Sequence, residues 1–153
     1  MRNETVARLG RRRVLLMDSI SLIGPDDAGT IIVCGSHGGA ISGAFAAKHP
    51  PALAFFNDAG IGKNGAGIAA LRNLEAAGIA AATVSHDSAR IGDALDAWDN
   101  GVVSHRNAWA ARVGIEAGQP VRHAVEAFGA AREDIEHTHN DQPDPIHLGS
   151  SSS

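Results

Sequence analysis

Blocks of apolar residues alternate with polar, glycine-rich stretches along the middle of the chain. Residues 30–34 form a continuous and mostly β-branched apolar run, which is typical of a strand buried on both faces. Similar runs at residues 52–56 and 79–84, and a shorter one at 102–103, predict three more strands. Residues 14–21 are a weaker candidate for a first strand, because polar residues interrupt the run.

Apolar residues at helical spacing fill the intervals between the predicted strands. We expect helices at about residues 41–48, 65–77 and 88–100, one carrying Trp109, and one opened by Pro120. Alternating strands and helices imply parallel neighbours joined by right-handed crossovers. The predicted fold class is therefore α/β: a single three-layer α/β/α sandwich with a mostly parallel, Rossmann-like sheet.

The length and composition of the chain suit one domain with one core. A chain of 153 residues buries roughly 70% of the surface that its unfolded form exposes. Residues 1–13 are polar and basic and are interpreted as an N-terminal arm or a short outer helix. Residues 14–131 make the predicted α/β domain, and residues 132–153, with prolines and terminal serines, are predicted to be a disordered polar tail.

The charge and cysteine content exclude several classes of function. The formal net charge is −4 and the only dense basic run is residues 11–13, so the broad positive field of a nucleic-acid-binding protein is missing. No apolar run approaches the roughly 18 residues of a membrane helix. The apolar run after the arginines ends at Asp18, well short of the roughly 7–15 residues of an export signal. Cys34 is the only cysteine, so a reducing, cytoplasmic location fits best.

Polar residues gather directly after each predicted strand, where ligands bind in open parallel sheets. The segments concerned are residues 35–39, 57–60, 85–88 and 104–107. Three of these four segments contain a Ser-His pair, which scattered histidines would not produce. We therefore expect Ser36, Asp58, His86 and His105 to meet around a common hollow. The alternative is that these residues only cap helices and turns.

The first of these segments is rich in glycine. Gly35, Gly38 and Gly39 permit the positive φ angles that turn successive backbone N–H groups toward an anion. A phosphate or a carboxylate group of a substrate would fit such a loop. A plain glycine turn is the alternative.

The same segment contains two candidate nucleophiles. The run from Cys34 to Gly38 resembles a nucleophile elbow with Ser36 on a strand-to-helix turn, although Cys34 stands where that motif has glycine. Cys34 itself is interpreted either as a small buried hydrophobe or as a thiolate. The second reading requires the backbone amides and His37 to lower its pKa.

A second glycine-rich segment offers two interpretations. Gly60 to Gly65 fits G-x-G-x-x-G after a strand, with Asp87 beyond the next strand, and resembles a dinucleotide-binding fingerprint. However, Asp58 precedes the first glycine, and a carboxylate repels a pyrophosphate. The milder interpretation is that Lys63, with Asn64 and Gly65 at the start of a helix, binds one anionic group of a substrate.

The next segment adds Arg90, which together with Lys63 would form an anion clamp around the substrate. Asp87 or Ser88 is expected to cap the following helix. Arg90, in its first turn, could then hold the same anionic group bidentately. The alternative is that Lys63 and Arg90 are solvated surface charges.

Metal binding has weak support in the sequence. Imidazole and carboxylate groups suit zinc and other divalent ions, and the candidates are His37, Asp58, His86 and His105. None of them lies in a close H-x-x-x-H pair. We therefore expect no cofactor and no metal, with a divalent ion as the open alternative.

These observations lead to a functional hypothesis. We expect an enzyme, with hydrolysis as its first reaction class and isomerase or lyase steps as alternatives, that acts on a small carboxylate- or phosphate-bearing substrate. His37 and His86 would move protons, and Asp58 or Asp87 would orient the histidine. The alternatives are a non-catalytic ligand-binding or regulatory domain and a nicotinamide- or flavin-binding domain.

The expected partner is the small-molecule substrate, with no nucleic acid and no membrane. We also expect a homo-oligomer, because helices rich in alanine and glycine often cover an apolar face with a second copy. Trp98 or Trp109 would anchor such contacts.

Overall fold

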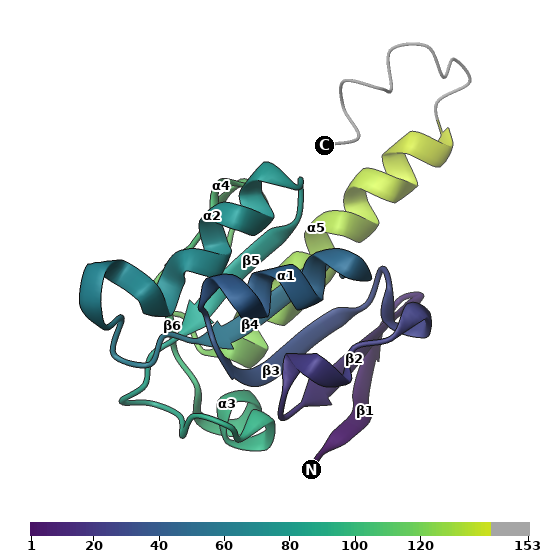
Figure 1. The fold of residues 1–153 in the computed structure, drawn as a ribbon. Helices are drawn as coiled ribbons and strands as arrows, with labels where there is room; N and C mark the ends of the chain where they lie inside the picture. The colour runs from purple at the N-terminus through teal and green to yellow at the C-terminus, as the bar shows by residue number, and fades with distance from the viewer. Residues whose placement is uncertain (142–153) are drawn as a thin grey trace.

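The computed structural model describes residues 1–141, apart from the side chains of Lys63 and of residues 132–141. Within that range the protein is an α/β fold built on a six-stranded mixed sheet (Figure 1). The strands are β1 Asn3–Leu9, β2 Arg12–Met17, β3 Ile31–His37, β4 Leu53–Asn57, β5 Ala80–Val84 and β6 Val103–Arg106. The α-helices are α1 Ala40–Lys48, α2 Ala69–Ala76, α3 Ala94–Asn100, α4 Ala108–Arg112 and α5 Val121–Asp141. Short 3-10 helices cover Ile20–Leu22, Pro25–Asp27 and Lys63–Ile68.

The strands lie side by side in the order in which the chain forms them, from β1 to β6. β2, β3, β4 and β5 are parallel, whereas β1 is antiparallel to β2 and β6 is antiparallel to β5. The predicted α/β class with a mostly parallel sheet is therefore confirmed. The carboxyl ends of the four parallel strands share one rim of the sheet.

The first strand lies where the sequence predicts an arm or a short outer helix. Residues Asn3–Leu9 pair with β2 as a hairpin, and Gly10 turns the chain with a φ of 61°. Leu9 contacts α5 closely, because a Cβ added at Gly129 would lie 2.8 Å from the Leu9 side chain. Most β1 side chains are exposed, so the strand lacks the continuous apolar run by which buried strands are recognised.

Two helices begin later than the sequence predicts. α2 starts at Ala69 rather than near residue 65, because Asn64 and Gly65 have positive φ angles of 57° and 71° that interrupt the helix. α3 starts at Ala94 rather than at residue 88. Its N-cap is Asp93, whose side chain accepts a hydrogen bond from the N–H of Asp96.

The direction of β6 corrects the predicted placement of residues 104–107. His105 pairs with Thr83 and Arg106 pairs with Ala82, so β6 runs back along β5. The chain after Val103 therefore moves away from the carboxyl ends of the parallel strands. Residues 104–107 do not follow a parallel strand, and only the start of β6 lies near that rim.

Both faces of the sheet are buried, which explains why the central strands are continuous apolar runs. One cluster joins alternate strand residues to α3 and α5; it includes Leu16, Val33, Phe55, Trp98 and Phe128. The other joins the intervening residues to α1 and α2; it includes Met17, Ile32, Phe56, Ala46 and Leu74. Figure 1 shows α1 and α2 in front of the sheet and α5 behind it.

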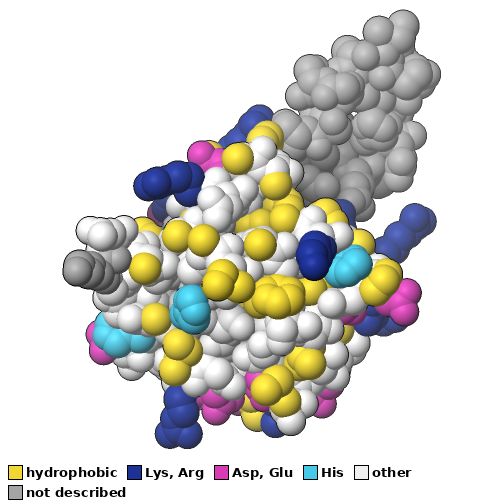
Figure 2. Space-filling view, viewed as in Figure 1, with side chains coloured by type: hydrophobic (Ala, Val, Ile, Leu, Met, Phe, Trp, Pro, Cys, Tyr) yellow, Lys and Arg dark blue, Asp and Glu magenta, His cyan; other side chains and the backbone are white. Residues whose placement is uncertain are grey.

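The surface on the side of α1 carries a group of hydrophobic side chains near its middle, with charged side chains around the margin (Figure 2). Ile41 on α1 belongs to the exposed apolar residues, with 72% of its surface accessible. None of the helices within residues 1–141 combines the length and the apolar character that crossing a membrane requires.

Candidate functional site

The carboxyl ends of β4 and β5 bring Asp58 and His86 into direct contact. Asp58 follows β4 at once, and its N–H donates to the carbonyl oxygen of Val84, the last residue of β5 (2.9 Å). The Oδ1 atom of Asp58 lies 3.1 Å from Nδ1 of His86. Two residues far apart in sequence therefore form a carboxylate–imidazole pair at the rim of the sheet.

Asp58 is a buried acceptor held by several donors. Its side chain is 6% exposed, and Oδ1 accepts hydrogen bonds from the N–H groups of Gly60 (2.8 Å) and His86 (3.1 Å). Burial acts to raise the pKa of Asp58, but hydrogen bonds from Gly60, the Ser104 hydroxyl and His86 outweigh it and hold the pKa below its usual value. Asp58 is therefore an ionised carboxylate at neutral pH.

The His86 ring places one nitrogen against this carboxylate and presents the other to the surface. The side chain is 49% exposed and packs over Gly60, where an added Cβ would lie 3.6 Å from Cε1. Because the buried Asp58 carboxylate only accepts hydrogen bonds, it favours the neutral tautomer with the proton on Nδ1, in which Nε2 is an acceptor. Nε2 lies 3.2 Å from Oδ1 of Asp87, whose side chain is 85% exposed. Asp87 can accept a hydrogen bond from Nε2 whenever that nitrogen carries a proton.

Two hydroxyl residues support the pair, and sequence reasoning missed both. The Oγ1 atom of Thr83 and the Oγ atom of Ser104 are 2.9 Å apart, and Ser104 also hydrogen-bonds to Asp58. The strand register shifts between Thr83 and Val84, which leaves Ser104 as the extra residue of β6. A bulge of this kind leaves no signal in the hydrophobic pattern.

The first glycine segment does not form the expected anion loop. Gly35, Gly38 and Gly39 are absent from the described residues with positive φ, so the predicted left-handed turn is wrong. The N–H of Gly38 donates to the carbonyl oxygen of Asn57 (2.8 Å), and the N–H of Gly39 donates to Nδ1 of His37 (3.1 Å). Two of the amides that were to bind an anion therefore already have acceptors.

These glycines allow close contact between backbone segments instead. A Cβ on Gly35 would lie 2.6 Å from the backbone nitrogen of Asp93, and one on Gly38 would overlap the carbonyl oxygen of Gly67. Gly67 is equally constrained, because its Cβ would overlap the carbonyl oxygen of Asp58. The glycines thus pack the loops of the rim against one another.

Neither candidate nucleophile of β3 is arranged as the sequence predicts. Ser36 lies within the strand rather than on a turn, and its Oγ accepts a hydrogen bond from the N–H of Ile20 (2.9 Å). Cys34 is fully buried, and burial raises the pKa of its thiol to about 12. The thiolate interpretation of Cys34 is therefore contradicted, whereas the alternative of a small buried hydrophobe fits, and the thiol stays protonated at neutral pH.

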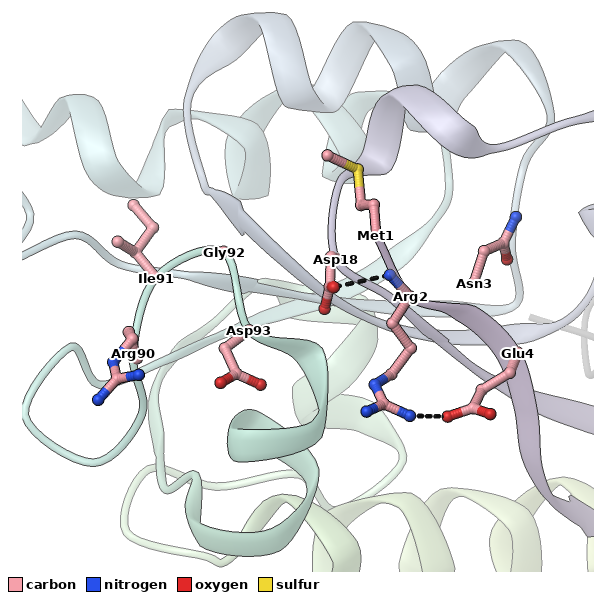
Figure 3. A pocket seen from close by; sticks show the side chains of 9 residues that line it. All are labelled: Met1, Arg2, Asn3, Glu4, Asp18, Arg90, Ile91, Gly92 and Asp93. Carbon is pink, nitrogen blue, oxygen red and sulfur yellow. Dashed lines mark hydrogen bonds and ion pairs between the residues drawn. The ribbon is translucent and has the colours of Figure 1, made fainter.

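An open hollow of about 590 Å³ lies beside the end of β2 (Figure 3). Arg2, just before β1, and Glu4 of β1 line it and pair with each other, and Arg90 and Asp93 line it from the loop before α3. The oxygens of Asp18 accept from the N–H groups of Arg2 and Ala94, each at 2.8 Å. The hollow is thus bordered by both positive and negative groups.

A second hollow of about 590 Å³ shares Asp18, Ile91 and Gly92 with the first and is lined by Ser36 and His37. Neither hollow is lined by Asp58 or His86. The structure therefore separates the predicted site residues into two groups along the rim.

The structure describes only the Arg90 half of the expected anion clamp. Arg90 lies in a loop rather than in the first turn of a helix, and its N–H donates to Oδ2 of Asp96 (2.8 Å). Ser88 stabilises the loop, since its Oγ donates to the carbonyl oxygen of Ser85 and accepts from the N–H of Val102. The side chain of Lys63 lies outside the described part of the chain.

The G-x-G-x-x-G segment does not open an α-helix. Asn64 and Gly65 lie in an irregular 3-10 turn, and in the first turn of α2 the N–H of Ala70 donates to the carbonyl oxygen of Gly38 (2.8 Å). The parallel strands also follow chain order, without the reversal at which dinucleotides bind. These features give the fingerprint no structural support.

Among the described residues, no hydrogen bond or ion pair joins His105 to Asp58 or His86. His105 lies opposite Thr83 in β6, and its buried Nδ1 has no hydrogen-bond partner among the described residues. Within that same part of the chain, no group of three or more histidine, cysteine or acidic residues is placed to hold a metal ion.

Comparison with known proteins adds no relative. No model of a protein family matches the chain, and neither a curated protein nor a solved structure shows significant similarity to it. The fold and site define it as an α/β protein with a carboxylate–imidazole pair at the carboxyl ends of its parallel strands. Its function has to be argued from that geometry.

Proposed function

We propose that the protein is an acid–base enzyme that hydrolyses a small molecule, with His86 as the general base and acid and Asp58 as its orienting partner. The observation that carries this proposal is the Asp58–His86 pair. A buried carboxylate with a lowered pKa faces one nitrogen of an imidazole whose other side is half exposed. This is the arrangement by which a histidine is held in one tautomer for proton transfer.

The proposed reaction begins at Nε2 of His86. In the neutral ring this atom accepts a proton from water as the water oxygen attacks the substrate, and the ring then returns the proton to the leaving group. Asp58 stabilises the protonated ring between these steps without taking the proton itself. Asp87 accepts a hydrogen bond from the protonated Nε2, which helps to hold that intermediate state. Isomerisation or elimination would use the same two groups.

The proposed substrate is a small molecule that carries a carboxylate or a phosphate. Arg2 and Arg90 border the hollow at the end of β2, although acidic groups border it as well. The hollow lies at the end of β2 and the acid–base pair at the ends of β4 and β5, so both share the carboxyl-end rim although the pair does not line the hollow.

We also propose a three-layer arrangement of the fold, a cytoplasmic location and a homo-oligomeric assembly. Two core clusters on opposite faces of the sheet support a three-layer arrangement, whereas the strand order lacks the reversal of a Rossmann fold. A single buried free cysteine favours the cytoplasm. The hydrophobic side chains grouped near the middle of the surface on the side of α1 favour a homo-oligomer, because a second copy would bury them (Figure 2).

The activity test uses hydrolysis of p-nitrophenyl acetate and p-nitrophenyl phosphate, measured by release of the coloured phenolate. We expect His86→Ala to lower kcat/KM by about 10²–10⁴-fold because it removes the base, and Asp58→Asn to lower it because it removes the carboxylate that orients the base. His123→Ala is the matched control, since His123 is exposed on α5. Equal rates in the wild type and His86→Ala would overturn the proposal.

The hollow beside β2 favours a second candidate function, a non-catalytic ligand-binding domain. This function requires binding without turnover. Calorimetric titration with inorganic phosphate and with acetate would then show heat of binding in the wild type and a weaker response in Arg90→Ala. Binding that is unchanged in His86→Ala, together with no ester hydrolysis, would favour this function over the enzyme.

A further inference from the structure

The chain contains two Asn-Gly pairs, Asn64-Gly65 and Asn100-Gly101, and the fold treats them differently. Glycine after asparagine leaves the backbone nitrogen unhindered for attack on the neighbouring side-chain amide. We propose that Asn64 is a site of spontaneous deamidation in the folded protein and that Asn100 is protected. This inference goes beyond the proposed function and does not depend on it.

The reaction needs only water as a partner. The backbone nitrogen of Gly65 attacks Cγ of Asn64, a carbon–nitrogen bond forms, and the side-chain amide leaves as ammonia with the proton from the Gly65 N–H. The resulting succinimide ring is opened by water at either carbonyl. The product is aspartate or isoaspartate, so that asparagine and water give an acid and ammonia.

The structure leaves the Asn64 side chain free to react. The residue is exposed, and none of the described residues forms a hydrogen bond with its side chain. Its φ and ψ of 57° and 26° lie in the left-handed region, which asparagine adopts more readily than most other residues with a side chain. A Cβ added at Gly65 would meet only Ile68 Cγ1, at 3.9 Å, so the peptide between the two residues has room to rotate.

Strain in the neighbouring residues favours the same motion. Ala59 and Ile61 have positive φ angles of 51° and 69°, and a β-branched residue rarely adopts this conformation. The segment also contains a kink at Asn64 and Gly65 that interrupts its 3-10 helix. Local opening of this loop relieves the backbone strain of its left-handed residues, which lowers the free energy that opening costs.

In contrast to Asn64, hydrogen bonds restrain Asn100 and the glycine that follows it. Its Nδ2 donates to Oδ1 of Asp96 (2.8 Å), and the N–H of Gly101 donates to the carbonyl oxygen of Ala97 (2.9 Å). Gly101 is buried, and a Cβ there would lie 2.7 Å from Val84 Cγ1. The attacking nitrogen is therefore occupied and fixed, and reaction at Asn100 requires local unfolding of the end of α3.

The test follows both sites in one sample. Trypsin cleaves after Lys63, Arg72, Arg90 and Arg106, so residues 64–72 and 91–106 leave as separate peptides. The folded protein is incubated in warm, mildly alkaline buffer, and the mass increase of each peptide is followed with time. We expect residues 64–72 to be modified at least about tenfold faster, because each 1.4 kcal/mol of opening free energy slows Asn100 tenfold.

The controls separate the effect of the fold from that of the sequence. In denaturant both pairs should react at similar rates, since the same dipeptide is then equally free. In folded Asn64→Gln the mass increase of residues 64–72 should disappear, while residues 91–106 behave as before. Equal rates at the two sites in the folded protein, or an unchanged signal in Asn64→Gln, would overturn the inference.

Discussion

At the scale of single residues, Asp58 combines a buried position with a full charge. Burial alone would favour the neutral acid, yet the N–H groups of Gly60 and His86 and the Ser104 hydroxyl favour the ion more strongly. Asp58 is thus part of the fold as well as of the site. Its contribution to stability must follow its ionisation.

The pH dependence of stability tests this role of Asp58. Because its pKa is lower in the folded state, its stabilisation is present above the unfolded pKa of about 4 and is lost as pH falls through the folded value. Asp58→Asn should therefore reduce the free energy of unfolding at neutral pH by about 1–3 kcal/mol. The difference from the wild type should shrink in acid.

Urea unfolding at several pH values measures this difference. Asp87→Asn is the matched control, because the Asp87 side chain is 85% exposed and should contribute little to stability. A constant difference between the wild type and Asp58→Asn from neutral to acidic pH would contradict this role.

How far the site could be predicted differs from residue to residue. Asp58 and His86 could be placed together, because the carboxyl ends of neighbouring parallel strands meet at one rim. Ser104 was missed as a partner of Asp58, since its position depends on a bulge. Gly38 was misinterpreted, because glycine allows both positive φ angles and close backbone contact, and a sequence does not distinguish the two.

At the scale of elements, Asn107 joins three of them. Its Oδ1 accepts hydrogen bonds from the N–H groups of Ala81 in β5 and Ala110 in α4, both at 3.1 Å. Its Nδ2 donates to the carbonyl oxygens of Leu71 in α2 (3.2 Å) and Ile79 before β5 (2.8 Å). This buried side chain therefore fixes α2, β5 and α4 relative to one another.

Removal of the Asn107 amide should weaken the fold strongly. Asn107→Ala leaves buried donors and acceptors without partners, and we expect a loss of about 3 kcal/mol in the free energy of unfolding. Asn73→Ala, at an exposed position on α2, is the matched control. The loss is read from urea titrations, and similar values for the two variants would show that the Asn107 hydrogen bonds do not hold these elements together.

The elements that the sequence predicts best are the buried ones. β3, β4 and β5 are continuous apolar runs because both of their faces are covered. β1 is an edge strand with mostly exposed side chains, so no such run marks it. The reversed direction of β6 depends on tertiary pairing with β5, which local patterns do not contain.

At the scale of the whole molecule, the sheet separates two apolar cores and carries its polar groups at the rim of the parallel strands. Cys34 lies in the core beneath α1 and α2, and burial raises its pKa to about 12. The thiol should therefore become reactive only when the molecule unfolds.

Thiol labelling tests this arrangement of the cores. In native protein near neutral pH, the single thiol should react very slowly with the aromatic disulfide DTNB, and it should react completely in denaturant. Absorbance of the released thionitrobenzoate gives both rates. Rapid reaction of the native protein would show that Cys34 is accessible and that this core is open.

The central claim is that Asp58 holds His86 in one tautomer, with Nε2 ready to take a proton. Long-range ¹⁵N–¹H correlation NMR of the His86 ring, at a pH where the ring is neutral, tests it most directly. We expect the proton on Nδ1 in the wild type and a shift toward Nε2 in Asp58→Ala, which removes the acceptor. A wild-type ring protonated on Nε2, or the same tautomer ratio in both proteins, would contradict the claim.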